Sequence, residues 1–348
     1  MENIAPALLD WFYQNRRILP FREDPTPYHV WLSEIMLQQT RVSAALPYYE
    51  RFLAALPDIP ALAGCEEEKL WEGLGYYSRV RNLQKAAKIV CAQYGGQLPA
   101  DYNALLALPG IGEYTAGAIA SISFGLPVPA VDGNVLRVFA RLYNDPRLVT
   151  DPQVKREFTA RVMEHQPPAK AGDYNQALME LGALVCLPNG APLCEQCPLG
   201  TLCRARAAGT ALSLPQKTPP KARRITPVTV ALVLNEGRVL LQQRPAKGLL
   251  AGLWQPVLWE DTTLTAAEAA ARLAALGLDC TGAHFTPLPA AKHIFTHIEW
   301  HQSGYFLTVP EQPAPAGCVW AGKEQLEAAY TLPGAFKVYK KLLLTKLL

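Results

Sequence analysis

One carboxylate, Glu34, stands in a mostly apolar stretch, Val30–Tyr49, which the hydrophobic spacing predicts to be a helix closed by Pro47. Its neighbours one turn away on such a helix are largely hydrophobic: Val30, Trp31, Leu37 and Gln38. A carboxyl group among them is poorly solvated, so its pKa should rise, as suits a general acid working near neutral pH. A Glu at the edge of a core helix, held by an Arg or a backbone N–H, is the structural alternative, and this stretch alone favours it.

A second group of candidate residues surrounds a predicted helical hairpin. Its turn, LPGIG at residues 108–112, contains two glycines and precedes an apolar helix. Free backbone N–H groups at the start of that helix could bind a phosphate. Asp132 follows Gly112 after twenty residues and precedes another predicted helix. This Asp is either an N-cap or a second reactive carboxylate.

Four cysteines form the third candidate site: Cys186, Cys194, Cys197 and Cys203. Seven, two and five residues separate them along the chain. In a reducing compartment such spacing indicates a metal site rather than disulfides. Four thiolates without a nearby His suit either zinc or an iron–sulfur cluster, and spacing alone does not choose between the two.

Length and composition indicate a globular protein. The chain has 348 residues, 50% of them hydrophobic, which is enough for two domains with full cores. No apolar run reaches membrane-spanning length, and the N-terminal residues lack the order of features of a signal peptide. We therefore expect a cytoplasmic protein with no membrane partner. The net charge of +3 permits DNA binding without arguing for it.

A basic, proline-rich segment divides the chain. Residues 1–213 are predicted to form an all-α domain, residues 214–227 a solvated linker, and residues 228–348 a smaller α+β domain. Besides the stretch around Glu34, the predicted helices are Ile4–Tyr13, Glu66–Trp71, Arg79–Gln93, Tyr102–Leu108, Thr115–Ser123, Val135–Leu142, Pro152–Met163 and Tyr174–Val185. In the second domain we predict a hairpin of Val228–Leu234 and Arg238–Gln243, a helix at Thr265–Leu276, strands near Ala290–Trp300 and Ser303–Val309, and a last helix.

Six motifs together resemble those of the MutY-type adenine DNA glycosylases, in the endonuclease III superfamily, over nearly the whole chain. They are VWLSEIMLQQT, GLGYYSR, LPGIGEYTAGAI, VDGNVLRV, ALMELGALVC and the four-cysteine loop. The resemblance implies a multidomain protein, with an all-α helix–hairpin–helix glycosylase domain followed by an α+β Nudix-like domain. It also implies a hydrolase of base excision repair, which cleaves the N-glycosidic bond of adenine mispaired with 8-oxoguanine or guanine in double-stranded DNA. A monomer at the bacterial nucleoid is expected.

The resemblance gives the candidate residues their roles. Glu34 would protonate an adenine rotated out of the duplex, and Asp132 would stabilise the positive charge that develops on the sugar. Tyr114 and Asn134 match positions that orient these groups, and Glu180 matches one that lines the base pocket. Endonuclease III has a Lys in place of Tyr114, so a Schiff base is excluded here and the enzyme should be monofunctional. The four cysteines match the ligands of one [4Fe–4S] cluster.

The resemblance also assigns contacts to DNA. Residues around the lesion opposite the adenine would be Gln38, Gln39, Thr40 and Tyr76, although a packed core aromatic is the alternative for Tyr76. The hairpin residues that grip a phosphate would be Leu108, Gly110 and Gly112. In the second domain, the loop that reads 8-oxoguanine would contain Phe295, Thr296 and His297. This chain departs from the usual family pattern at Phe21 (usually Trp), at Thr296 (usually Ser) and in its first cysteine gap, which is one residue longer than is typical.

Other functions fit parts of the pattern. A thymine or oxidised-pyrimidine glycosylase could use the same scaffold, but the GLGYY motif and the second domain argue against it. A non-catalytic iron–sulfur DNA-binding protein or redox sensor would not need both Glu34 and Asp132. A nucleotide pyrophosphohydrolase would need an acidic metal-binding stretch after Gly252–Pro256, where Glu268 stands alone among alanines.

Overall fold

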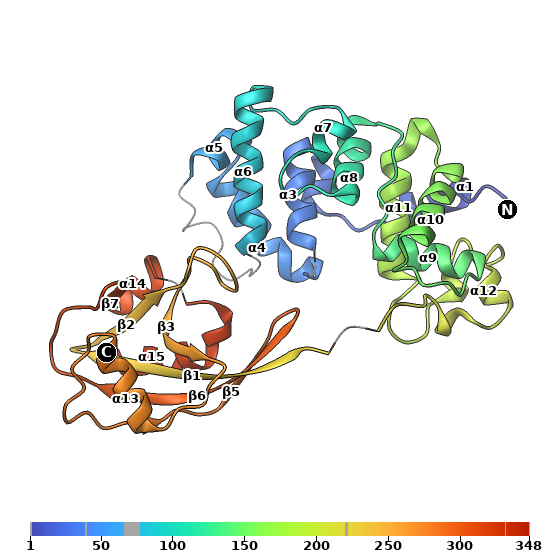
Figure 1. The fold of residues 1–348 in the computed structure, drawn as a ribbon. Coiled ribbons are helices and arrows are strands. Elements are labelled where there is room, and N and C mark those ends of the chain that lie inside the picture. Colours follow the sequence, from blue (N-terminus) through green and yellow to red (C-terminus); the bar gives the residue numbers. More distant parts are fainter. Residues whose placement is uncertain (1, 39, 66–76, 220–221, 331, 348) are drawn as a thin grey trace. The chain divides into compact units, whose positions relative to one another are not determined.

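The computed structural model describes residues 2–38, 40–65, 77–219, 222–330 and 332–347 (Figure 1). The described residues divide into two compact units, the first containing residues 2–38, 40–65 and 78–219 and the second residues 222–330 and 332–347. No helix in these described ranges is long and apolar enough to cross a membrane.

The first unit is helical, as predicted. Its longer helices are α1 (Ala5–Asn15), α3 (Pro27–Leu37), α4 (Val42–Ala55), α6 (Tyr77–Tyr94), α8 (Glu113–Phe124), α9 (Gly133–Tyr143), α10 (Pro152–His165) and α11 (Ala171–Leu184). Its short helices are α2 (Pro20–Glu23), α5 (Ile59–Gly64), α7 (Tyr102–Leu106), η2 (Pro168–Lys170), η3 (Cys194–Gln196), α12 (Arg204–Ala207) and η4 (Ala211–Ser213). Within 2–38, 40–65 and 77–219 the structure has no β-strand, and a single bridge pairs Leu148 with Gln216.

The prediction of one helix over Val30–Tyr49 is wrong. Thr26 caps α3, which ends at Leu37, and α4 starts afresh at Val42 with Pro47 inside it. Proline removes one backbone donor but does not always end a helix, and apolar residues on both sides of the break hid it from the periodicity. The helix predicted at Glu66–Trp71 lies outside the described residues.

Helix α8 lies at the centre of the first unit, where it contacts α3, α7 and α11. Its buried residues are small or β-branched, including Ala116, Gly117, Ala118 and Ala120. A Cβ on Gly117 would come 2.0 Å from the carbonyl oxygen of Pro129. The glycine therefore lets the chain before α9 run directly against α8.

The second unit is a mixed sheet with helices on both faces, as the α+β prediction required. Its strands are β1 (Arg224–Asn235), β2 (Arg238–Gln243), β3 (Trp254–Glu260), β4 (Thr286–Pro287), β5 (Ala291–Ile294), β6 (Ile298–Thr308) and β7 (Cys318–Ala321). The order is β4-β6-β1-β3-β2-β7, with β5 paired to β6. Strand β1 is parallel to β6 and antiparallel to β2 and β3.

Alternate residues of β1 enter two different cores. Val228, Val230 and Leu232 pack with α14 (Lys323–Ala328) and α15 (Lys337–Lys346), whereas Ala231 and Val233 pack with α13 (Ala266–Ala275). This period of two is what separates the faces of a sheet. The predicted hairpin is confirmed, since Asn235 pairs with Arg238 across Glu236 and Gly237, both at positive φ.

Two boundaries differ from the predictions. The strand predicted near Ala290–Trp300 is two strands, because the chain turns back where Phe295 N–H donates to the Ile298 carbonyl (2.8 Å). The predicted strand Ser303–Val309 is the second half of β6. The predicted linker is also shortened from both sides: Leu214 is buried, Thr218 N–H donates to Thr150 Oγ1 (3.2 Å), and β1 already begins at Arg224.

Gly117→Ala should destabilise the first unit by about 1–3 kcal/mol, the usual cost of overpacking, although Ala normally favours a helix over Gly. The new methyl group has no room beside Pro129. Chemical unfolding measures the change, with Gly64→Ala as the control because a Cβ there meets nothing within 4 Å. Equal stability of both variants would show that the backbone at residue 129 can move away without cost.

Candidate active site

Seven of the predicted site residues line one cleft of about 1210 Å³ in the first unit. Its walls come from α2, α3, α4, α8, α11 and the start of α9. The predicted residues that line it are Glu34, Gln38, Thr40, Tyr114, Asp132, Asn134 and Glu180. Gln39 and Tyr76 lie outside the described residues.

Glu34 is held in the cleft wall by α3 and is only 8% exposed. Burial raises the pKa of its carboxyl group to about 7; the nearby Asp132 carboxylate also raises it, whereas the Tyr114 hydrogen bond and the charge of Arg22 lower it. The Tyr114 hydroxyl donates to Glu34 Oε2 at 2.5 Å. Around neutral pH this carboxyl group can therefore hold a proton and give it up.

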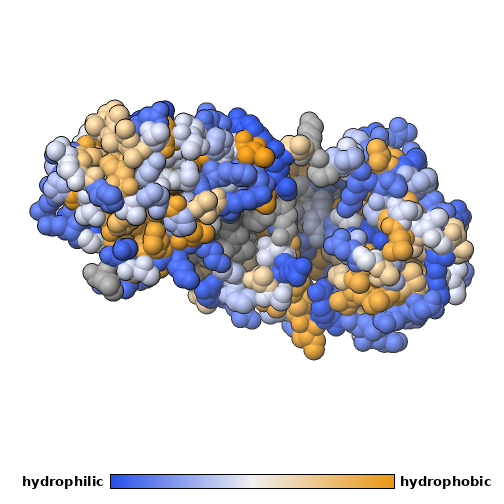
Figure 2. Space-filling view, turned by 90° about the horizontal axis from the view of Figure 1, so that it is seen from below, coloured by the Kyte–Doolittle hydropathy of each residue, from blue (hydrophilic) through white to orange (hydrophobic). Residues whose placement is uncertain are grey.

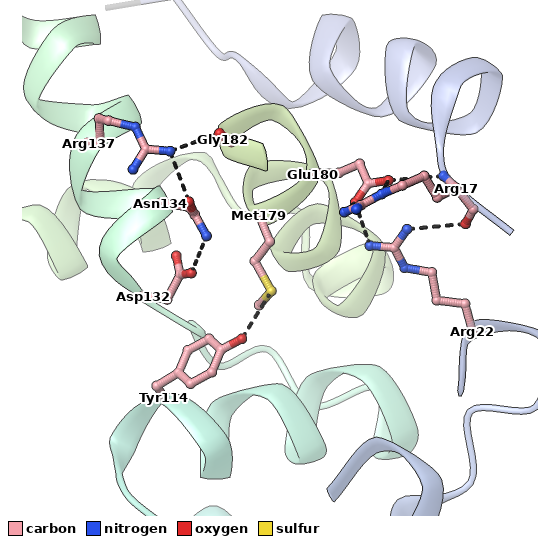
Figure 3. A network of polar contacts seen from close by, with 9 residues as sticks. All are labelled: Arg17, Arg22, Tyr114, Asp132, Asn134, Arg137, Met179, Glu180 and Gly182. Carbon is pink, nitrogen blue, oxygen red and sulfur yellow. Dashed lines mark hydrogen bonds and ion pairs between the residues drawn. The ribbon is translucent and has the colours of Figure 1, made fainter. Parts of the chain in front are cut away.

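Tyr114 lies in the first turn of α8, immediately after the hairpin. Burial and the nearby carboxylates of Glu34 and Asp132 raise the pKa of its phenol well above the ordinary value. Its hydroxyl also lies 3.4 Å from the sulfur of Met179 on α11 (Figure 3). Tyr114 thus stays a neutral hydrogen-bond donor that fixes the orientation of Glu34.

Asp132 is the N-cap of α9, yet its carboxylate also lines the cleft. One oxygen accepts from the Val135 N–H (2.8 Å) and the other from Asn134 Nδ2 (2.6 Å). Burial raises the pKa of this carboxyl group, and both hydrogen bonds oppose the rise. The two interpretations offered by the sequence are therefore compatible, because the cap fixes the direction in which the carboxylate faces.

Asn134 is fixed in turn by Arg137, which the sequence analysis missed. Arg137 donates to Asn134 Oδ1 (2.9 Å) and to the Gly182 carbonyl (2.8 Å), as Figure 3 shows. It also donates to the Cys186 carbonyl (2.8 Å). A hydrogen-bonded chain thereby joins Asp132 to the beginning of the cysteine loop. The sequence feature that could have indicated a role for Arg137 is the pair Arg137 and Arg141, one turn apart on a predicted helix that is otherwise apolar.

Glu180, on α11, is 1% exposed and fully paired. Arg17 donates to it from its guanidinium (2.7 and 2.8 Å) and from its backbone N–H (3.0 Å), and Arg22 donates at 2.8 Å (Figure 3). Burial raises the pKa of Glu180, but the hydrogen bonds and charges of Arg17 and Arg22 outweigh it and lower the pKa to about 2. Neither arginine was predicted from the sequence.

The predicted hairpin is present between α7 and α8. Gly110 has φ +81°, and a Cβ there would meet the Asn82 side chain at 2.8 Å. Leu108 is buried beneath the turn, while Gly112 is exposed and caps α8. The start of α8 can therefore face a phosphate.

The four cysteines line one small cavity together with Arg141 and Arg206. Arg141 donates to the Cys186 sulfur at 3.2 Å. Across the described part of the chain, no three His, Cys, Asp or Glu side chains converge closely enough to hold one metal ion. A zinc ion binds four cysteine sulfurs at Zn–S distances of about 2.3 Å, so the sulfurs lie close together. In an iron–sulfur cluster each cysteine sulfur binds a different iron atom, so the cysteine sulfurs lie farther apart. Four thiolates without a histidine are a donor set that suits either group.

In the second unit, the predicted reading loop is the turn between β5 and β6. The ring of Phe295 is partly buried and packs edge-on against His293 and Trp300, with ring centroids 4.5 Å and 5.0 Å away, at the edge of one core of this unit. Thr296 and His297 are exposed at the tip of the turn. Thr296 and His297 are therefore the more exposed of the three predicted side chains, and Phe295 is partly buried.

The chain is similar in sequence to known DNA repair proteins. Residues 32–164 match the HhH-GPD superfamily of base excision DNA repair proteins, and residues 229–342 match the NUDIX domain. The human adenine DNA glycosylase is 35% identical over 398 residues, covering 96% of this chain and 73% of the relative. The mouse adenine DNA glycosylase is 36% identical and covers 96% and 76%. This chain belongs to the adenine DNA glycosylase family.

The enzyme therefore removes adenine from DNA in base excision repair. Solved structures agree on the fold. A thermostable thymine-DNA glycosylase has a TM-score of 0.53 at 26% identity, covering 58% of this chain and 94% of that one. Endonuclease III in a non-covalent DNA complex has a TM-score of 0.50 at 23% identity, covering 59% and 96%, and shows the shared fold alone.

Proposed function

We propose that the enzyme acts as a monomer on double-stranded chromosomal DNA and excises adenine opposite 8-oxoguanine or guanine. Glu34 is its general acid and Asp132 the group that stabilises the sugar. The observation that carries this assignment is the sharing of one cleft by two carboxyl groups, one of them with a pKa near neutrality.

The adenine must leave the base stack before its glycosidic bond can be reached. Glu34 then donates its proton to a ring nitrogen of adenine, which we assign as N7. The bond from the base to C1′ breaks, its electrons leave with the protonated adenine, and the sugar gains oxocarbenium character. Asp132, held by Asn134 and the Val135 N–H, offsets that positive charge until water attacks C1′. The products are free adenine and an abasic site.

The same geometry supports a monofunctional enzyme. Strand cleavage through a Schiff base needs an amine beside the sugar, and Tyr114 offers a phenol instead. Lys155 pairs with Glu113 at 3.0 Å and is not among the residues that line the cleft. Arg17 and Arg22 keep Glu180 ionised. These three charged groups have fixed positions in the cleft, where they can recognise adenine.

The rate of adenine release should fall as the pH rises through about 7, because the reactive form of Glu34 is the protonated one. Glu34→Gln should lower the single-turnover rate by about 100- to 10,000-fold and leave duplex affinity nearly unchanged. Glu50→Gln, which removes an exposed carboxylate from α4, is the matched control. Weakened binding with an unchanged single-turnover rate would remove Glu34 from the chemistry.

For the cysteine loop we propose one [4Fe–4S] cluster held by Cys186, Cys194, Cys197 and Cys203. Such a group, when bound, cross-links the loop through four iron–sulfur bonds and so determines its shape. Arg141, which donates to the Cys186 sulfur, would balance part of the negative charge of the thiolates. Arg137, which donates to the Cys186 carbonyl, couples the loop to Asn134.

The purified protein should be brown, with a broad visible absorbance typical of thiolate-bound iron–sulfur clusters. Cys197→Ser should lower iron content and thermal stability, whereas Cys91→Ser, on α6 outside the loop, should change neither. Elemental analysis gives the iron and zinc content. A colourless protein carrying one zinc per chain would overturn the assignment.

For the second unit we propose that Thr296 and His297 read 8-oxoguanine. Guanine and 8-oxoguanine differ at N7 and C8, where a hydroxyl can accept from N7–H and an imidazole can donate to O8. Both side chains are exposed, and their turn is anchored from beneath by Phe295. The turn thus presents two polar side chains to solvent above the packed ring of Phe295.

The double variant Thr296→Ala, His297→Ala should lose about ten- to a hundred-fold of the preference for 8-oxoguanine over guanine opposite adenine, since one or two such hydrogen bonds are worth that much. The measurement is the ratio of single-turnover rates and of Kd values for the two duplexes. His284→Ala removes another exposed imidazole from the same unit and should keep the ratio. An unchanged ratio in the double variant would show that the first unit, and not this turn, distinguishes 8-oxoguanine from guanine.

A further inference from the structure

Ile18 is both highly exposed and part of the cleft wall. Its side chain is 83% exposed, more than any other large hydrophobic residue in the described ranges. It also lines the cleft that contains Glu34 and Glu180. On the face drawn in Figure 2, apolar surface is scattered among hydrophilic residues, so exposure alone carries no meaning. The position of Ile18 at the cleft is what distinguishes it.

The backbone on both sides of Ile18 is held rigidly. Before it, the Arg17 N–H donates to Glu180 Oε1 (3.0 Å), and the Arg17 carbonyl accepts from Arg22 (3.3 Å). After it, Leu19 is buried at 5% exposure. Figure 3 shows Arg17 and Arg22 converging on the same buried carboxylate. The segment is therefore fixed to the wall of the cleft, and the isoleucine is the apolar group it presents to solvent.

We propose that Ile18 covers the extruded adenine at the mouth of the cleft and so helps to hold it out of the duplex. This role rests on the proposed use of the cleft as the adenine pocket. The two faces of a purine are apolar compared with its edges, so an aliphatic side chain can pack on one face without competing for hydrogen bonds. The contact removes both surfaces from water, and it also keeps water away from the base that Glu34 must protonate.

The role differs from a general contact to DNA. A side chain that packs on the extruded base stabilises only complexes that contain such a base. A side chain that packs in a groove or on the backbone stabilises every complex with the same duplex. Duplexes with and without the adenine base therefore separate the two cases.

The test is Ile18→Ser in the full-length protein, with Ile18→Val as the conservative variant. Leu212→Ser, in η4, removes a side chain that is 71% exposed and does not line the cleft, so it is the matched control. Binding is measured with a duplex that carries a non-cleavable adenosine analogue and with the same duplex carrying an abasic-site analogue. Thermal stability should be unchanged in all three variants because both side chains are exposed.

Ile18→Ser should weaken binding of the adenine-containing duplex by about ten- to a hundred-fold, the range expected when a buried aliphatic contact is lost. It should change binding of the abasic duplex little, while Ile18→Val keeps most of the affinity and Leu212→Ser keeps all of it. Equal losses on both duplexes, or no loss on either, would overturn the proposal. The assignment of Glu34 is tested separately by its pH profile, so either hypothesis can fail while the other stands.

Discussion

The burial of one carboxyl group, that of Glu34, is the constraint on which the arrangement of the first unit depends. Two glutamates line the same cleft and are almost equally hidden from water, yet their pKa values move in opposite directions, to about 7 for Glu34 and about 2 for Glu180. Glu34 has a phenol as its hydrogen-bonding partner, whereas Glu180 has two guanidinium groups. The same cleft thus holds one carboxyl group that titrates near neutrality and another that stays ionised, and the neighbours of each determine the difference.

The groups around Glu34 are fixed through a small number of helix ends. Tyr114 comes from the first turn of α8, and Asp132 caps α9, so both residues lie where backbone N–H groups are unpaired and the helix dipole is positive. This favours negative charge near the cleft, and it partly offsets the burial that raises the pKa of Asp132. The close approach of α8 to the chain before α9 at Gly117 is what brings the two helix starts together.

The sequence predicted most of the helices, the hairpin at residues 108–112, the β1–β2 hairpin and seven of the residues that line the cleft. It missed the break between α3 and α4 because apolar residues resume on the far side of the short polar stretch at residues 38–41. It missed the turn at Phe295 because that turn contains neither Gly nor Pro. The arginines Arg17, Arg22 and Arg137 were missed for another reason. The partner of Arg17 and Arg22 is 158 to 163 residues away. Arg137 has one local partner, Asn134, but its other two are the carbonyls of Gly182 and Cys186, which only the folded chain brings close.

Asp132 illustrates why a structural and a chemical reading of one residue need not compete. Capping uses both of its oxygens, one on the Val135 N–H and one on Asn134, and Asn134 is itself fixed by Arg137. A carboxylate that was free to rotate would turn toward solvent and lose its orientation toward a sugar in the cleft. Each carboxylate oxygen has more than one lone pair, so the cap leaves accepting capacity and the negative charge available. The helix start therefore supplies the rigidity that electrostatic stabilisation of a short-lived cation requires.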